Sequence, residues 1–392
     1  MPFSWKVGRR MDEKKTFSYI RIYNEIKGQI LSGAFAPGMK LPTEAELQAA
    51  YGVSRITVKK AMDLLVDNAL IERYPGKGTF IRDSSGAEAS ASQQEPERVP
   101  ASDSKIIGML MSGFSPAFGQ DFLRGVAAET NRQGWCLMTG IGHSSTQEES
   151  ELIQRMIRNG AKGLVVMPIH TESGINAGIV NCAMQNFPLV LADRYLDGLS
   201  LPYVGSDHAD ASFQIMQYLF SLGHTEIGLI SSAPTTTAIF ERENGYMKAY
   251  AMTPYHARPE NLVYDICSTL PNHRTEESFR KDVERMKRYF HENPNVTALL
   301  CIDHTVMDVC ETAAAELGLR IPEDLSLACF DASAQDPGQP SYTHIRQPEH
   351  EVGVQAVRML LDVISGSSDA HAQRLLLPTE LCIGASTGAP RR

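Results

Sequence analysis

The spacing of hydrophobic residues divides the chain into two parts. Close to the N-terminus, apolar residues recur at three- and four-residue intervals, which predicts an amphipathic helix. They are Ile22, Tyr23, Ile26, Ile30 and Leu31. From Lys105 onward, short apolar runs alternate with longer amphipathic stretches, a pattern typical of alternating strands and helices. We therefore expect a small helical part followed by a larger α/β part.

The segment 41–52 predicts a short helix with a defined start and end. Thr43 followed three residues later by Glu46 is a capping box, in which the Thr43 hydroxyl accepts a backbone N–H and Glu46 reaches back to the Thr43 N–H. A helix should therefore begin at Glu44. Gly52 should end it, because glycine tolerates the positive φ that a helix C-terminus commonly requires.

A second helix and a hairpin are predicted to follow. Ser54 is the expected N-cap of the second helix. The apolar stripe of this helix consists of Val58, Ala61, Met62 and Leu65. Two short runs at 70–74 and 79–81 predict strands that are joined by a turn at 75–78. Together these elements predict a winged helix-turn-helix.

Cationic and hydroxyl side chains occupy the side of the second helix opposite its apolar stripe. In a helix-turn-helix, the start of this helix enters the major groove, so these side chains would reach base edges. The expected DNA-binding residues, including two in the wing, are Thr43, Ser54, Arg55, Thr57, Lys59, Lys60, Lys77 and Gly78. The alternative is a plain three-helix unit whose cationic face is only solvated.

Charge is divided unevenly along the chain. Residues 1–82 hold 14 Lys and Arg against 8 Asp and Glu, a net of +6, and the whole chain carries −9, which leaves −15 on residues 83–392. This division suits nucleic-acid binding confined to the N-terminal part, because the acidic remainder would repel phosphate. We expect a DNA-binding head (16–82), a polar linker (83–104) and an effector-binding and dimerisation body (105–392).

Each half of the body has the same predicted alternation of strands and helices. The predicted strands are 106–111, 136–139, 163–167 and 188–192, then 226–231, 262–264, 297–302 and 325–330. Helical or connecting segments follow them, such as 120–133 and 276–291. Apolar strands between helices imply parallel sheets covered on both faces. The predicted fold is therefore an α/β multi-domain protein, with two parallel-sheet lobes in series forming the body.

Side chains that follow the predicted strands are candidate ligands. In open parallel sheets, small molecules bind beyond the carboxyl ends of the strands, so two lobes with facing ends create a cleft. Guanidinium and carboxylate groups pair with vicinal hydroxyls, and aromatic faces stack on a sugar's C–H surface. The expected effector-binding residues are Phe118, Gln120, His143, Arg194, Arg242, Asp303 and Asp331. Ordinary loop polarity is the alternative for any one of them.

Composition narrows the class of protein further. With 392 residues, 43% of them hydrophobic, the chain is long enough for two or three domains with substantial cores. No run has the apolar length of a signal-peptide core at the start or of a membrane-spanning helix later, so we expect a cytoplasmic protein without a membrane partner. The seven cysteines are scattered without a C-x-x-C pair, which indicates reduced packing residues and no metal site or cofactor.

Three motifs of the head resemble the GntR family of bacterial regulators. In family order they are Leu41-Pro42-Thr43-Glu44, the run from Gly52 to Val58, and Gly76-Lys77-Gly78-Thr79-Phe80. The resemblance implies a winged helix-turn-helix that binds DNA. Many members carry a DNA-contacting Arg where this chain has Ala45, so more of the contact would fall on Arg55, Lys59, Lys60 and the wing.

The body, over about residues 105–390, resembles the effector-binding domain of LacI-type repressors, itself similar to periplasmic sugar-binding proteins. The matching segments are 190–194, 222–224, 242–246, 321–326, 329–331 and 345–348. By this resemblance, Arg242 and Asp331 fall where the family holds ligand hydroxyls or carboxylates, and Asp303 falls where it often has Asn followed by Asp. A GntR-type head on a LacI-type body is similar to the arrangement in arabinose repressors.

These resemblances imply a sequence-specific transcription regulator, favouring a homodimeric repressor of carbohydrate-utilisation genes. A small carbohydrate effector would close the two lobes and release the operator DNA. The alternative keeps DNA binding but lets a partner protein, rather than a sugar, control the body. The sequence lacks G-x-S-x-G, a Walker loop, H-E-x-x-H and a strand-following G-x-G-x-x-G, which argues against catalytic residues and an enzyme.

Overall fold

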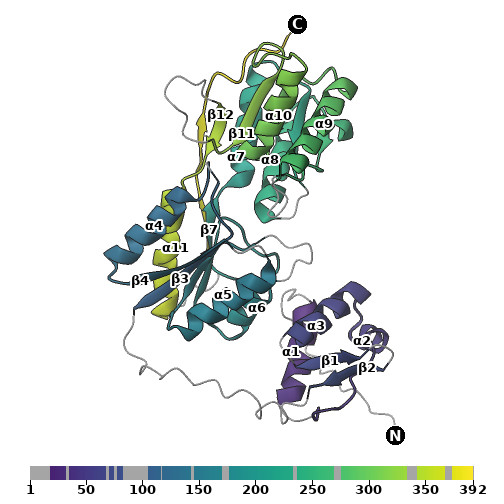
Figure 1. Cartoon of the computed structure of the whole chain (residues 1–392), viewed down its shortest axis with the longest axis vertical. Coiled ribbons are helices and arrows are strands. Elements are labelled where there is room, and N and C mark those ends of the chain that lie inside the picture. The colour runs from purple at the N-terminus through teal and green to yellow at the C-terminus, as the bar shows by residue number, and fades with distance from the viewer. Residues whose placement is uncertain are drawn as a thin grey trace. The chain divides into compact units, whose positions relative to one another are not determined.

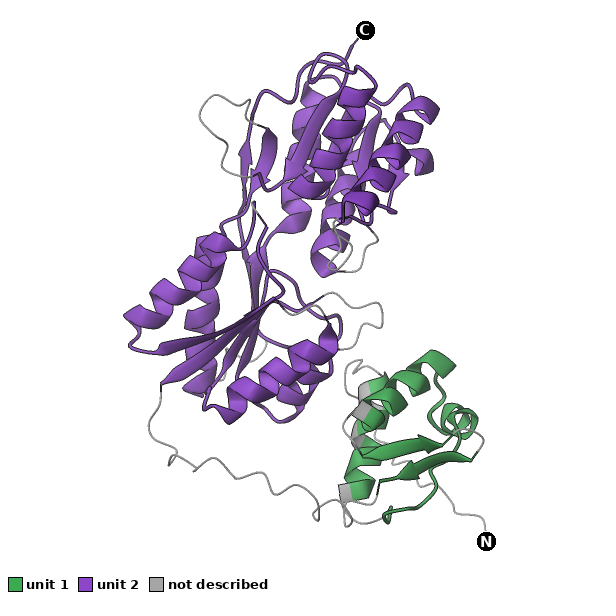
Figure 2. Ribbon diagram, viewed as in Figure 1, with its two compact units in different colours: residues 1–102 green, residues 103–392 purple. Residues whose placement is uncertain are grey.

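The chain divides into two compact units, residues 1–102 and 103–392 (Figure 2). The computed structural model describes residues 18–31, 35–67, 70–74, 77–82, 105–115, 117–142, 145–169, 176–232, 236–268, 275–332, 342–366 and 373–391. The expected linker 83–104 and the candidate ligand His143 lie outside these residues. Every helix in the described ranges is too short or too polar to cross a membrane.

The head is a winged helix-turn-helix, as its sequence predicts. Its elements are α1 (Ser18–Leu31), α2 (Glu44–Tyr51), α3 (Arg55–Asp67), β1 (Ile71–Tyr74) and β2 (Gly78–Ile81) (Figure 1). Strands β1 and β2 pair antiparallel and form the wing. Helices α1 and α3 pack together, and most residues of the apolar stripes predicted on them are buried, whereas Ile30 is partly exposed. The buried residues include Ile22, Tyr23, Ile26, Val58, Ala61, Met62 and Leu65.

The predicted caps fix the ends of the two short helices. The Thr43 hydroxyl accepts the Glu46 N–H at 3.3 Å, and the Glu46 carboxylate accepts the Thr43 N–H at 2.8 Å, which closes the capping box. Gly52 then follows α2 with a φ of 63°. Ser54 accepts the Thr57 N–H at 3.3 Å and so begins α3. Both predicted helix starts are confirmed.

The N-lobe of the body is a sheet with strand order β13-β7-β6-β5-β3-β4, in which neighbouring strands are parallel. Its strands are β3 (Ile106–Met111), β4 (Cys136–Ile141), β5 (Leu164–Val166), β6 (Leu189–Ala192), β7 (Tyr203–Ser206) and β13 (Arg374–Leu377). Its helices are α4 (Gln120–Arg132), α5 (Thr146–Arg158), α6 (Ala177–Met184) and α11 (Glu349–Ile364). Helices α4 and α11 lie on one face, and α5 and α6 on the other (Figure 1).

The C-lobe has a second sheet, with strand order β14-β12-β11-β10-β8-β9. Its strands are β8 (Ile227–Ile230), β9 (Leu262–Val263), β10 (Ala298–Cys301), β11 (Ser326–Phe330), β12 (Thr343–Arg346) and β14 (Glu380–Cys382). Only β14 pairs antiparallel among these described strands. The helices are α7 (His208–Ser221), α8 (Thr237–Ala251), α9 (Glu276–Glu292) and α10 (His304–Glu316), with a short 3₁₀ helix η2 (Pro259–Asn261).

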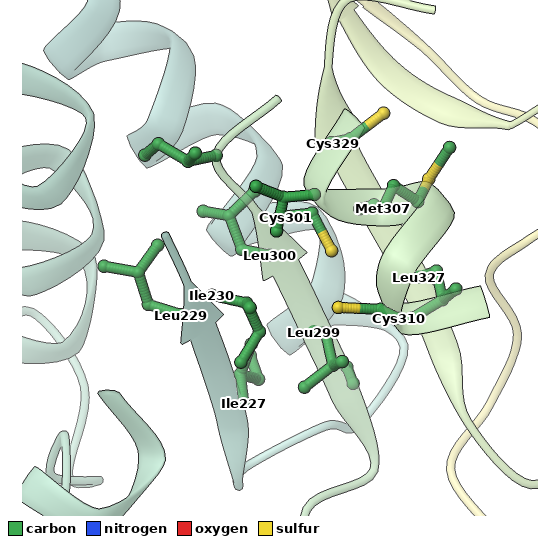
Figure 3. Close-up of a cluster of buried hydrophobic side chains, with 14 of the residues drawn as sticks. Ile227, Leu229, Ile230, Leu299, Leu300, Cys301, Met307, Cys310, Leu327 and Cys329 are labelled. Atoms are coloured by element: carbon green, nitrogen blue, oxygen red, sulfur yellow. The ribbon is translucent and has the colours of Figure 1, made fainter. Parts of the chain in front are cut away.

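Three thiols are part of the apolar core of the C-lobe (Figure 3). Cys301 on β10 lies in register with Cys329 on β11, and Cys310 approaches from α10. All three are buried and free, and burial raises the pKa of the Cys301 and Cys329 thiols well above the usual value. A buried neutral thiol behaves as a small hydrophobic side chain, in keeping with the packing role expected for most of the cysteines.

The two lobes are interwoven, so the expectation of two units in series is wrong. The chain enters the C-lobe after β7, returns after β12 to form α11 and β13, and crosses again to form β14. Helix α11 packs so closely on α4 that a Cβ on Gly125 would lie 2.0 Å from the His350 carbonyl oxygen. The prediction failed because it assigned no strand or helix after residue 330, where α11 and β13 return to the N-lobe and β14 joins the C-lobe sheet.

Candidate functional site

The start of α3 presents polar side chains to solvent. The Arg55 side chain is 81% exposed, and its Nε lies 3.8 Å from a Glu44 carboxylate oxygen, too far for a hydrogen bond. Lys59 is also exposed. Ile56, which sequence analysis did not select, is 69% exposed beside them, and an exposed aliphatic side chain here could contact a thymine methyl group.

The remaining predicted head residues divide into exposed groups and positioning groups. Thr43 and Ser54 are exposed but use their hydroxyls as helix caps, and the Ser54 and Thr57 oxygens lie 2.8 Å apart. The Lys60 ammonium lies 6.0 Å from the centre of the Tyr19 ring. These groups shape the surface around Arg55, whose own side chain has room to reach a base.

The wing adds cations that the sequence analysis only partly identified. Lys77 is exposed, as expected for a phosphate contact. Gly78 has a φ of 118°, and a Cβ there would lie 2.6 Å from Lys40 Cε, so glycine lets the Lys40 stem cross the wing. Arg73 on β1 pairs with Asp63 at 2.7 Å and remains 39% exposed. Lys40 and Arg73 were missed because neither is in the second helix or the turn.

In the body, charged residues from both lobes gather around Arg242. This α8 residue is only 7% exposed, and burial lowers the pKa of its guanidinium; the charges of Asp331, Asp193 and Asp303 oppose this shift, and that of Arg194 adds to it. We call these five residues the charged cluster. It unites four of the predicted effector residues. Asp193 directly follows β6, in the segment 190–194 that resembles LacI-type repressors, but was not among the expected ligands.

Three contacts fix the Arg242 side chain. One terminal nitrogen donates to the Ile302 carbonyl at 2.6 Å, and Nε donates to Nδ1 of His208 at 3.3 Å. The guanidinium carbon also lies 4.0 Å from the centre of the Phe330 ring, a cation–π contact. The Arg242 guanidinium carries five N–H donors, so donors remain that could bind a ligand.

His208 is buried at the start of α7, directly after the crossover from β7. Burial and the neighbouring Arg242 charge lower the pKa of its imidazole to about 3, so the ring is neutral at physiological pH. A neutral ring can accept from Arg242 at Nδ1, which leaves the proton on Nε2, 3.8 Å from an Asp193 oxygen. Sequence analysis missed His208 because it missed β7.

Asp331 is the most strongly perturbed carboxylate of the charged cluster. It follows β11 with a φ of 58°, is 8% exposed, and both of its oxygens lie 3.0 Å from the Gln347 amide nitrogen. Burial raises the pKa of Asp331 to about 7, although Arg242 and the Gln347 bond oppose this shift. Gln347 itself accepts from Ser206 on β7 at 2.8 Å, so Asp331 is connected to a crossover strand.

The other two acids of the charged cluster have local partners. Asp303 caps α10, where one of its oxygens accepts the Val306 N–H at 2.8 Å. Asp193 has a φ of 62°, and one of its oxygens lies 3.2 Å from Nε of Arg194. These bonds orient the carboxylates of the charged cluster, in which three acids face two arginines and the acids are in excess only when Asp331 is ionised.

The remaining predicted ligands lie on a separate loop of the N-lobe. Phe118 is half-buried against the N-lobe core, and Gln120 is exposed as the first residue of α4. Between them, the Gly119 N–H donates to Glu349 at 2.7 Å. Glu349 affects the pKa of Asp331 through its charge, and burial raises the pKa of Glu349 itself to about 7. Sequence analysis missed Glu349, which bonds to Gly119 and whose charge also acts on Asp331 of the charged cluster.

A cavity of about 520 Å³ lies elsewhere in the C-lobe, at the amino ends of β8 and β10. Its Glu226 already accepts from Asn261 at 3.1 Å and pairs with Arg258 at 2.9 Å. We place the candidate ligand site at the charged cluster instead, because ligands of parallel sheets bind at the carboxyl ends of strands. Within the described ranges, no three His, Cys, Asp or Glu side chains are grouped to hold a metal ion.

A winged helix-turn-helix head joined to a two-lobe α/β body is the architecture of a DNA-binding transcription regulator. Residues 18–81 match the bacterial regulatory proteins of the gntR family, and residues 216–387 match the periplasmic binding protein-like domain.

Three relatives by sequence are named transcriptional repressors. The arabinose metabolism transcriptional repressor of Geobacillus stearothermophilus is 27% identical over 387 residues, which cover 96% of this chain and 99% of the relative. That of Halalkalibacterium halodurans is 26% identical, over 88% of this chain and 89% of its own. The repressor CytR of Escherichia coli K12 is 25% identical, over 74% and 82% of the two chains.

Solved structures match the body. The transcription regulator CcpA of Lactococcus lactis superposes with a TM-score of 0.62 at 19% identity, over 72% of this chain and 99% of that one. A LacI family transcriptional regulator from Mycobacterium smegmatis gives 0.61 at 19% identity, over 72% and 99%. The chain therefore joins a gntR-type head to a LacI-like two-lobe body, the arrangement of an arabinose-repressor-like regulator.

Proposed function

We propose that this protein is a homodimeric repressor that binds operator DNA through α3 and the wing and releases it when a small neutral sugar binds at the charged cluster. A sugar would bind between the lobes and stabilise one lobe arrangement, and this change would alter how a dimer presents its two heads to the operator. Acting on genes, the protein would work in the cytoplasm, without a membrane partner and without catalytic activity of its own.

The observation that carries this proposal is the chemistry of the charged cluster. Arg242 donates and Asp331 and Asp303 accept, so adjacent hydroxyls of a sugar could bind both kinds of group. Once Asp331 is ionised, above its pKa of about 7, the three acids outnumber the two arginines, which disfavours phosphorylated or carboxylated ligands because a further anion would be repelled. The names of the two arabinose repressors among the relatives support a pentose.

The proposal assigns roles to individual predicted residues. Arg55, Lys59 and Thr57 would read bases, while Lys77, Lys60 and the backbone at Gly78 would contact phosphates. Arg194, Arg242, Asp303 and Asp331 would bind the sugar, and the loop that holds Phe118 and Gln120 would line the cleft.

Calorimetric titration of the full chain with D- and L-arabinose, ribose, xylose, glucose and their phosphates tests the proposal. We expect one free sugar to bind and its phosphate to bind more weakly. If none of these compounds binds at millimolar concentration, the sugar proposal is wrong, and control of the body by a partner protein becomes the better explanation.

A further inference from the structure

A second set of contacts joins the lobes beside the charged cluster. It consists of Tyr195 and Arg374 from the N-lobe and of Thr237 and Glu241 from the first turns of α8 in the C-lobe. We call these four residues the interlobe clasp. None of them was selected from the sequence, because they come into contact only when the chain crossings bring the N-lobe and C-lobe segments together.

The Thr237 hydroxyl forms hydrogen bonds with the backbone of one residue, Tyr195, in the other lobe. The Tyr195 N–H donates to Oγ1 of Thr237 at 3.0 Å, and this hydroxyl in turn donates to the Tyr195 carbonyl at 3.1 Å. A hydroxyl can accept and donate at once, so Thr237 satisfies both backbone groups of Tyr195. A valine at this position would keep the shape of the side chain and lose both bonds.

The side chains of the interlobe clasp add a second connection. The Tyr195 hydroxyl donates to Glu241 at 2.7 Å, and a terminal nitrogen of Arg374 lies 3.6 Å from the same carboxylate oxygen. The Arg374 guanidinium also stacks on the Tyr195 ring, 4.0 Å from its centre. The Glu241 side chain is only 17% exposed, which shields these bonds from competition by water. Burial and the bond to Glu241 raise the pKa of Tyr195, so its hydroxyl keeps the proton that it donates.

Each half of the interlobe clasp is adjacent in sequence to a residue of the charged cluster. Tyr195 directly follows Arg194, and Glu241 directly precedes Arg242. The contacts between Tyr195 and α8 therefore constrain the separation of these two arginines, which lie on different lobes.

We propose that Tyr195, Thr237, Glu241 and Arg374 are positioning residues that hold the two lobes in the binding-competent arrangement before the sugar arrives. This inference rests on the proposed function for the sugar, whereas its structural part, the fixed lobe separation, does not. A protein that populates its competent state only in part shows an affinity reduced by that fraction. Loss of the interlobe clasp should therefore weaken sugar binding even though every ligand-contacting group remains.

The distance between the lobes gives a readout that needs no sugar. Cys136 in the N-lobe and Cys267 in the C-lobe are both exposed and can carry spin labels in the full chain, with Cys382→Ser to prevent labelling at the remaining partly exposed thiol. Dilution with unlabelled protein isolates the distance within one chain. The test variant is Tyr195→Phe combined with Thr237→Val, and Tyr195→Phe alone serves if the double variant does not fold.

Tyr264→Phe is the matched control. The Tyr264 hydroxyl also donates to a glutamate of α8, Glu243, but both residues lie within the C-lobe. Pulsed electron resonance should show one narrow distance distribution for the wild type and for this control. We expect a broader and longer distribution for the test variant, and the narrow one when Thr237→Ser is the only change, because serine keeps the hydroxyl that makes both bonds.

Titration with the sugar that binds the wild type completes the test. Affinity should fall about tenfold in the test variant and stay unchanged in the control, as expected if the competent state drops to about a tenth of the population. An unchanged distance distribution, or an altered one with unchanged affinity, would overturn the positioning role. If no sugar binds the wild type, the proposed function fails, and the distances alone then decide whether the interlobe clasp fixes the lobes.

Discussion

The head and the body use arginine in opposite ways. The Arg55 side chain in the head is 81% exposed, with a carboxylate only at 3.8 Å, whereas Arg242 in the body is 7% exposed and held by a carbonyl, an imidazole and an aromatic ring. A side chain that must read a rigid groove has to reach out from its surface. A side chain that binds a small molecule is more effective when its position is already fixed.

This contrast predicts how each region responds to mutation. Removing an exposed cation from the head changes contacts with DNA but leaves the fold intact, since surface substitutions cost little stability. Removing a member of the charged cluster leaves a buried charge without its partner, which is costly in itself. Variants of the body therefore need a measurement of DNA binding beside the measurement of sugar binding.

The largest effect is expected for Asp331→Ala. A buried hydrogen bond to a charged group contributes roughly 1.5–3 kcal/mol, about ten- to a hundredfold in affinity, so sugar-induced release should be lost at ordinary sugar concentrations. DNA binding should persist, because the head folds around its own core. The operator affinity of the full chain, titrated with sugar by fluorescence anisotropy, measures both.

Asp265→Ala is the control for this variant. Asp265 is an exposed C-lobe carboxylate that pairs with Arg285 at 2.9 Å, so its loss should leave release unchanged. If Asp331→Ala still releases the operator at the wild-type sugar concentration, Asp331 does not bind the effector.

Arg55→Ala should have the next largest effect, and on the head only. A lost base contact typically costs about 1–3 kcal/mol of discrimination, so operator affinity should fall more than affinity for random DNA. Sugar affinity should not change. Competition binding with operator and scrambled duplexes measures the ratio, and an equal loss on both duplexes would remove Arg55 from base reading.

Sugar binding should depend on pH through Asp331. Its pKa is raised by burial to about 7 in the folded protein, and the ionised carboxylate is the form that accepts sugar hydroxyls. Affinity should therefore fall by up to about tenfold for each pH unit below 7 and level off above it. Calorimetry between pH 5.5 and 8 checks this, and a flat profile would contradict it.

The same raised pKa affects stability with a defined sign. The folded protein holds the Asp331 proton more tightly than the unfolded chain does, so the free energy of unfolding should fall as pH rises from about 4 to about 7. Glu349, whose pKa burial also raises to about 7, contributes in the same direction. Asp331→Asn removes only the first contribution, and denaturant unfolding of this variant should show a shallower slope.

Lys77→Ala should have the smallest effect. Loss of one phosphate contact weakens binding to all DNA sequences alike and lowers the slope of log affinity against log salt by about one. Discrimination between operator and random DNA should stay at the wild-type value. A change in discrimination would show that the wing reads bases as well.

The sequence predicted the parts of the fold that depend on neighbouring residues. Thr43 and Glu46 lie within one helical turn of each other, and Gly52 bonds to Gln48 one turn before it, so each end of α2 could be predicted from local chemistry alone. Strands β3, β5 and β6 were found because buried parallel strands are continuous apolar runs. Arg242 and Asp331 were found through the family resemblance and their places after predicted strands.

The parts that were missed depend on the path of the chain between the lobes. His208, Gln347 and Glu349 lie where the chain crosses between lobes, and the crossover strand β7 contains Gly205, which weakens its strand pattern. The interlobe clasp joins Tyr195 to Thr237, two residues 42 positions apart. No local pattern encodes such a contact, because it exists only once both lobes have assembled.

The central claim is that a sugar bound in the body lowers the affinity of the head for operator DNA. The most direct test is the operator affinity of the full wild-type chain with and without a saturating concentration of the sugar identified by calorimetry. We predict that saturating sugar weakens operator binding at least tenfold while binding to random DNA changes little. Equal operator affinity in the two conditions, with the sugar demonstrably bound, would contradict the account.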